Sequence, residues 1–117
     1  MSLTTFINKI KKGDPVSFAE TMAIINDNFH YQPIRFTNGL IDDLLINAAG
    51  SNEGSCKIFA FSLLHQLDKQ QTLELFGDYY RIDVLTNPEE TDHQNIRNFI
   101  KYGWDGISFE GQALTAK

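Results

Sequence analysis

The stretch Asn47-Ala-Ala-Gly-Ser-Asn-Glu-Gly54 is a polar loop of small residues, and Ser55-Cys-Lys-Ile-Phe-Ala-Phe-Ser-Leu-Leu-His-Gln-Leu67 follows it directly. The apolar residues of the second segment fall on nearly every side of a helix. A helix without a polar face is normally buried. We therefore expect a central helix from Ser55 to Leu67, entered from a glycine-containing loop and surrounded by the rest of the chain.

Amphipathic helices are predicted on both sides of this central helix. The helix signals are apolar residues at spacings of three and four, capping boxes, and glycines at helix ends. We expect helices from Leu3 to near Gly13, from Ser17 to about Asn28, from Asp68 to Gly77, from Tyr79 to Leu85, and from Thr91 to Gly103. In the last of these, Thr91 with Gln94 is predicted to form the capping box, and Asp92 adds a carboxylate near the positive helix end.

Alternating apolar and polar residues indicate a small sheet. Strands are predicted over Tyr31–Thr37, within Leu40–Asn47 and over Ile107–Glu110, with Asn38-Gly39 as a hairpin turn. The tail from Gln112 to Lys117 is expected to fray. The sequence thus predicts an α+β fold: a single domain over residues 1–117, mainly helical, with a small antiparallel or mixed sheet.

Composition narrows the classes of function. The chain has 117 residues, a net charge of −5 and one cysteine. The acidic balance argues against nucleic-acid and anionic-membrane partners, and the lone cysteine suits a reducing, cytoplasmic compartment. No secretory signal peptide is visible, and the apolar run Ile58–Leu64 is too short to span a bilayer. Residues 1–40 hold four basic and three acidic side chains, so the acidic excess lies in the remainder, where it suits a solvated face.

The loop before the central helix is a candidate anion site. A glycine-rich loop at a helix N-terminus presents free N–H groups. The candidate ligating residues are Asn52, Glu53, Gly54, Ser55 and Lys57, together with Arg81. The pattern is not a P-loop, and the Glu53 carboxylate would repel an anion. The alternative is structural: the glycines shape the turn into the helix, and Ser55 caps it.

Cys56 is the candidate nucleophile. In the first turn of a helix, the dipole is expected to lower the pKa of its thiol. His93, beside Asp92, is the candidate base, and we expect the loop Asn47–Cys56 and the start of the last helix to line one polar cleft. The alternatives are a buried, inert thiol and a histidine that is hydrogen-bonded for structure.

No metal site and no cofactor are predicted. Glu90 and His93 have the spacing of a di-metal motif, but Glu90 precedes the predicted cap and is out of helical register. The aromatic run Tyr79-Tyr80 offers rigid contact area for a partner or for packing. Trp104 is expected to anchor the final turn.

Several segments resemble the HopJ family of type III effector-like proteins. They are Phe36-Thr-Asn-Gly39, the run Asn47–Phe61, Phe76-Gly-Asp-Tyr-Tyr-Arg81, Asp83-Val-Leu85, Asp92–Phe99, Gly103-Trp104 and Phe109-Glu-Gly111. The resemblance covers about Phe18 to Leu114. It implies an effector secreted by a type III system, or a related small bacterial protein, and it assigns no role to the matching residues Asn47, Glu53, Cys56, Lys57, Tyr80, Arg81, Asp92, His93, Asn95 and Arg97.

Two classes of function follow from these patterns. The first is an interaction module or effector that binds a protein partner, which an exposed aromatic patch including Tyr79 or Trp104 would support. The second is a small cytoplasmic enzyme that uses Cys56 as nucleophile and His93 as base. The sequence leaves the oligomeric state open.

Overall fold

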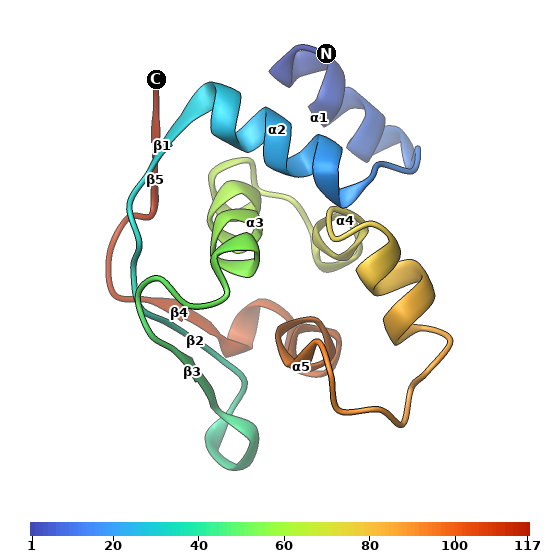
Figure 1. Ribbon diagram of the computed structural model, residues 1–117, viewed down its shortest axis with the longest axis vertical. Helices are drawn as coiled ribbons and strands as arrows, with labels where there is room; N and C mark the ends of the chain where they lie inside the picture. The colour runs from blue at the N-terminus through green and yellow to red at the C-terminus, as the bar shows by residue number, and fades with distance from the viewer.

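The computed structural model describes all 117 residues, and the chain wraps around the central helix α3 (Glu53–Leu64). Figure 1 shows α3 at the middle, with helices above and to the right and strands to the left and below. The side chains of Ile58, Phe59 and Phe61 are fully buried. The predicted buried central helix is therefore confirmed. Its last turn reaches the surface, where Leu63 and Leu64 are each 49% exposed.

Two helices form the N-terminal part. The first, α1 (Leu3–Lys12), ends at Gly13, whose φ of 82° lies in the left-handed region that glycine adopts readily. The second, α2 (Phe18–Asn28), begins with the predicted capping box, in which Ser17 accepts from the Glu20 N–H and the Glu20 carboxylate accepts from the Ser17 N–H. Both helices pack their apolar residues inward, which confirms the predicted N-terminal pair.

The second half of the chain is also mainly helical. The helix α4 (Lys69–Glu74) starts at the predicted Asp68–Gln71 capping box. A π-helical turn, η2 (Tyr79–Val84), follows Gly77, whose φ is 62°. The last helix, α5 (Gln94–Tyr102), ends at Gly103 and continues into the 3-10 turn η3 (Gly103–Gly106). A Cβ at position 77 would lie 2.6 Å from the Phe18 backbone nitrogen, so only glycine fits at this crossing.

Five short strands form two antiparallel sheets, which confirms the α+β class. One sheet pairs β1 (Phe29–Tyr31) with β5 (Leu114–Ala116). The other has the order β3-β2-β4, with β2 (Phe36–Asn38) between β3 (Leu45–Asn47) and β4 (Ile107–Phe109). In this sheet Phe36 pairs with Asn47 on one side and Phe109 on the other.

The predictions for the first strand and for the C-terminal tail are wrong. Residues 31–37 do not form one strand: β1 ends at Tyr31, and β2 begins at Phe36. Pro33 lies between them, and its lack of an N–H makes it unsuited to a ladder position. The tail does not fray, because β5 pairs with β1 and buries Leu114, which is only 1% exposed.

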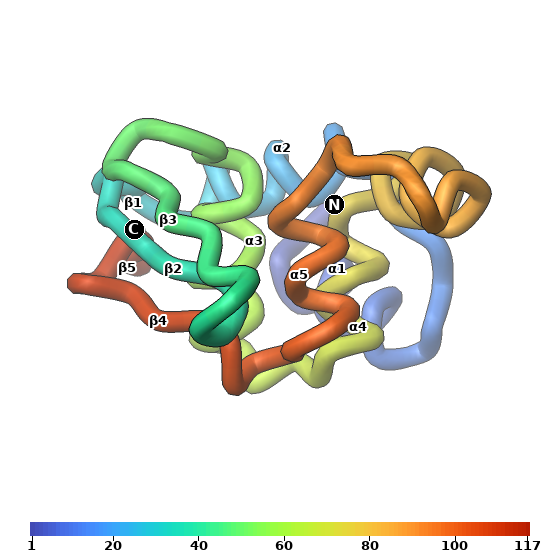
Figure 2. Tube along the Cα trace, turned by 90° about the horizontal axis from the view of Figure 1, so that it is seen from below, coloured from blue at the N-terminus to red at the C-terminus, as the bar shows by residue number.

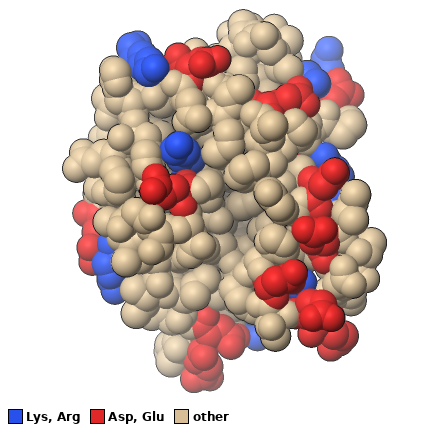
Figure 3. All heavy atoms as spheres, in the orientation of Figure 1, with Lys and Arg blue, Asp and Glu red and all other residues tan.

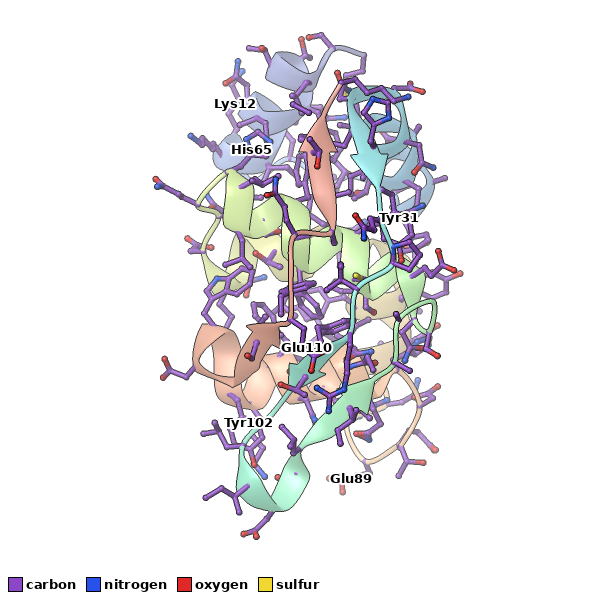
Figure 4. The ribbon with its side chains drawn as sticks, turned by 90° about the vertical axis from the view of Figure 1, so that its left-hand side faces the viewer. Lys12, Tyr31, His65, Glu89, Tyr102 and Glu110 are labelled. Atoms are coloured by element: carbon purple, nitrogen blue, oxygen red, sulfur yellow. The ribbon has the colours of Figure 1, made fainter.

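The predicted Asn38-Gly39 turn is also wrong, although the hairpin exists. Asn38 is the last residue of β2 and is fully buried. The connection to β3 runs through a 3-10 turn, η1 (Ile41–Asp43), and is longer than a two-residue turn. Tyr102 and Lys101 of α5 both bind the Asp43 carboxylate, so tertiary contacts shape this connection (Tyr102 is labelled in Figure 4).

The caps of two helices differ from the predictions. The N-cap of α3 is Asn52 rather than Ser55, and the N-cap of α5 is His93 rather than Thr91. Both N-caps have a φ of 52°, and neither side chain bonds to the first turn of its helix. Asn52 and His93 instead use their side chains in contacts elsewhere. The first turns of α3 and α5 therefore keep their N–H groups free of a side-chain cap.

Candidate functional site

A network of asparagines, three of them buried, joins the sheet to the starts of α3 and α5. Asn47 and Asn95 exchange side-chain hydrogen bonds of 3.1 and 2.9 Å. Asn38 donates to the Asn95 carbonyl at 2.8 Å and to its Oδ1 at 3.1 Å. Asn52 donates to the Asn47 Oδ1 at 2.7 Å. We call these four residues the asparagine network. Because its members come from β2, β3, the loop and α5, it fixes these elements relative to one another.

The network brings two helix starts to one cavity. Figure 2 shows α3 and α5 running in the same direction, with their first turns at the same end of the molecule. A cavity of about 470 Å³ lies there. It is lined by Phe18, Leu45, Asn52, Gly54, Ser55, Phe76, Tyr79, His93, Gln94, Asn95 and Ile96. The expected approach of the loop and the last helix is thus observed.

Aromatic rings form the apolar wall of the cavity. Phe18 and Tyr79 pack edge to face with centroids 5.1 Å apart. A Cβ at Gly54 would lie 2.8 Å from the Phe18 ring, so Gly54 lets this ring approach the first turn of α3. Tyr79 keeps 44% of its surface exposed. The wall therefore continues from the cavity to the outer surface.

His93 links the cavity to the segment that precedes α5. Its Nε2 lies 3.1 Å from the Asp83 Oδ2 and 3.8 Å from the Asp92 Oδ2. Its ring packs against Tyr79, with centroids 5.3 Å apart. Asp92 is held mainly by Arg97, and this hydrogen bond lowers the pKa of the Asp92 carboxyl. The partner that orients His93 is consequently Asp83, which the sequence did not single out.

Chemically, the cavity combines two kinds of surface. The uncapped first turns of α3 and α5 contribute backbone N–H donors, and the asparagine and glutamine side chains add further polar groups. Phe18, Phe76 and Tyr79 contribute apolar area. A ligand that suits this surface has an apolar or aromatic group next to hydrogen-bond acceptors.

Cys56 is separated from this chemistry. It is 1% exposed and does not line the cavity. Its Sγ lies 3.8 Å from the Ile34 carbonyl oxygen, to which the thiol donates. Burial raises the pKa of the Cys56 thiol, so the predicted lowering is wrong. The desolvation of the thiolate outweighs the positive charge of the nearby Lys57, which favours the thiolate.

The predicted anion-site residues divide into two groups. Asn52, Gly54 and Ser55 line the cavity, whereas Glu53, Lys57 and Arg81 do not. The Lys57 ammonium donates to Asn26 at 3.0 Å and lies 4.7 Å from the centre of the Tyr31 ring.

Arg81 is also occupied. Its guanidinium bonds to the Glu74 carboxylate at 2.9 Å and to the Val16 carbonyl at 2.7 Å. It also lies 3.9 Å from Asp78. These contacts tie η2 to α4 and to the turn before α2, so Arg81 brings no positive charge to the cavity.

Sequence reasoning missed the roles of Phe18, Asn95 and Asp83. Burial of Asn95 could have been predicted, because it stands beside Ile96 at the buried face of an amphipathic helix. Phe18 was only part of the helix predicted from Ser17, and no local pattern pairs Asp83 with His93 ten positions later.

The structure also bears on metal binding and on membrane spanning. No group of three or more His, Cys, Asp and Glu side chains is placed to hold a metal ion. No helix has the length and hydrophobicity needed to cross a membrane.

Comparison with known proteins gives one family and one similar structure. Residues 3–114 match the model of the family described as HopJ type III effector protein. The match includes α1, which the resemblance noted above did not. A crystal structure described as that of the unknown function protein VPA0580 is 52% identical, with a TM-score of 0.94, and the alignment covers 100% of this chain and 95% of the other. No curated protein matches the chain. The chain belongs to the HopJ type III effector protein family.

Proposed function

We propose that this HopJ-family chain is an interaction module that binds a segment of a protein partner in the cavity between the starts of α3 and α5. The observation that carries the proposal is the continuous aromatic wall, in which Tyr79 lines the cavity and is also 44% exposed. Tyrosines at the mouths of preformed pockets are typical contact residues, since they offer rigid area at low entropic cost.

The surroundings of Tyr79 support this proposal. Ile82 and Leu85, in and just after η2, are each 53% exposed. An apolar side chain of the partner would enter the cavity. Backbone carbonyl groups of the partner would accept hydrogen bonds from the N–H groups in the uncapped first turns of α3 and α5. The asparagine network would hold the cavity open before binding, which lowers the cost of ordering the site.

A selection of displayed peptides on the full-length chain tests this function. We expect peptides that bind the wild type and lose about tenfold or more in affinity for Tyr79→Ala, as for a central interface tyrosine. Ile41→Ala is the matched control, because Ile41 is 93% exposed and does not line the cavity. Failure to select any peptide that depends on Tyr79 would contradict the proposal.

A second candidate is a small enzyme, favoured by the 3.1 Å contact of His93 with Asp83 at the cavity wall. In this candidate His93, oriented by Asp83, acts as a general base on a ligand in the cavity. Of the predicted pair, Cys56 is the weaker member, because its thiol is buried away from the cavity. Hydrolysis of model esters that is lost in His93→Asn and retained in Cys56→Ala would support the candidate, and no hydrolysis by the wild type would remove it.

The family description also suggests where the module acts. We propose, on that description alone, that a type III system can export the chain. Phe6 and Ile10 of α1 are buried, so export of the N-terminus would require α1 to undock. A translocation reporter fused to the chain is expected to reach host cells only when the secretion system is intact. Equal signals with and without the system would contradict this.

A further inference from the structure

The segment between α4 and α5 carries an acidic edge beside the cavity. We call Asp78, Asp83, Glu89, Glu90 and Asp92 the acidic rim. The same segment has one basic side chain, Arg81, which is paired with Glu74. Figure 3 shows acidic side chains gathered at the lower right of this face, where Figure 1 shows the chain running from α4 to α5.

Two of the five carboxylates of the acidic rim, those of Glu89 and Glu90, are unpaired within the chain. Asp92 is paired with Arg97 at 2.7 Å, and Asp83 lies 3.1 Å from the His93 Nε2. Asp78 is 3.9 Å from Arg81 and 79% exposed. Glu89 and Glu90 are exposed and take part in no ion pair and no side-chain hydrogen bond (Glu89 is labelled in Figure 4). The rim therefore presents carboxylates that are free to meet cations from outside.

The acidic rim and the apolar wall belong to the same stretch of chain. Tyr79, Ile82 and Leu85 supply exposed apolar surface, and Asp78 and Asp83 stand among them. A partner that covers the apolar residues would bring its own flanking side chains close to the carboxylates. Opposite charge on those side chains would speed association and select among partners, whereas like charge would oppose it.

We infer that the occupant of the cavity is a basic amphipathic segment of a protein, with an apolar or aromatic anchor in the cavity and lysines or arginines along the acidic rim. This inference rests on the interaction function proposed above and names the chemistry of its partner. Nucleic acids and anionic membranes would be repelled by the rim. A second copy of the chain carries a net charge of −5, so it is disfavoured as the occupant.

The test uses peptides selected from an unbiased displayed library on the full-length chain. We expect the peptides that depend on Tyr79 to carry net positive charge and at least one aromatic residue. The double variant Glu89→Lys/Glu90→Lys should bind the synthetic consensus peptide about tenfold or more weakly, since the two unpaired charges of the acidic rim are reversed. Wild-type affinity should also fall as salt is raised.

The matched control is the double variant Asp27→Lys/Asp105→Lys, which makes the same change of net charge at exposed positions on α2 and η3. It should keep the wild-type affinity within about twofold, because a distant charge is screened. Circular dichroism of both variants should match the wild type. Equal losses in the two variants would show a general charge effect and would overturn the inference.

The outcomes separate the inference from the function on which it rests. Neutral or acidic peptides that still depend on Tyr79 would overturn the basic partner and leave the interaction module standing. The absence of any Tyr79-dependent peptide would contradict the interaction module itself. Concentration-dependent dimers that Tyr79→Ala abolishes in sedimentation would identify a second copy as the occupant and would also overturn the inference.

Discussion

Asn47 and Asn95 bind each other reciprocally: the Nδ2 of each donates to the Oδ1 of the other, at 3.1 and 2.9 Å, across 48 positions of sequence. Asn47 ends β3, and Asn95 lies in the first turn of α5. Their side chains are buried, so water cannot replace either bond cheaply. This pair therefore fixes the start of α5 against the sheet and sets one side of the cavity.

Asn95→Ala is expected to lower the free energy of unfolding by about 2–3 kcal/mol, because Asn38 and Asn47 would both lose buried hydrogen-bond partners. Urea unfolding measures the change. In a double-mutant cycle, Asn47→Ala should cost less in the Asn95→Ala background than in the wild type. Strictly additive losses would contradict a coupled network.

Ser62→Ala is expected to raise the free energy of unfolding by about 1 kcal/mol. The Ser62 hydroxyl is buried in α3 and has no hydrogen-bond partner, so its removal relieves an uncompensated desolvation. Thr72→Val is the contrasting variant, because the buried Thr72 hydroxyl donates to the Asp68 carbonyl at 2.7 Å. It should destabilise the fold. A destabilising Ser62→Ala would show that its hydroxyl has a partner.

The fold is expected to lose stability as the pH falls through the range in which His65 titrates. Burial, and secondarily the charge of Lys11, lowers the pKa of His65 from 6.5. The unfolded chain then binds the proton more readily than the folded chain, so stability falls with pH from about 6.5 downward. Urea midpoints measured across this range should show a smaller loss in His65→Phe than in the wild type. Equal slopes in both proteins would contradict this account.

Cys56 is expected to resist thiol reagents in the native protein near neutral pH. Burial both hides the Sγ and raises the pKa of the thiol, so little reactive thiolate is present. A chromogenic disulfide reagent should react with the native chain only as fast as the protein opens, and rapidly in denaturant. Reaction of the native chain at the rate of a free cysteine peptide would contradict the assigned environment.

The helical frame was largely predictable because its signals are local. The central helix was indicated by its all-round apolar composition, and the capping boxes at Ser17 and Asp68 depend on residues three positions apart. The caps Asn52 and His93 were not predictable in this way. Their side chains are engaged by Asn47 and Asp83 through tertiary contacts, so local preference did not decide them.

The site was predictable only in part, for the same physical reason. The approach of the loop to the start of α5 followed from polar residues gathered at two helix starts. The position of Cys56 did not follow, since periodicity could not tell which side of α3 faces Ile34 and which faces the cavity. The pairing of β5 with β1 likewise depends on residues that lie over 80 positions apart.

The amide NMR spectrum of the full-length chain, titrated with a peptide selected on it, tests the central claim most directly. Binding in the cavity predicts the largest shift changes at Gly54, Ser55, Tyr79 and Asn95, which line it. The amides around Ile41, at the exposed end of the hairpin, should stay unchanged. Changes confined to the hairpin end, with the cavity residues unaffected, would contradict the assignment of the cavity as the binding site.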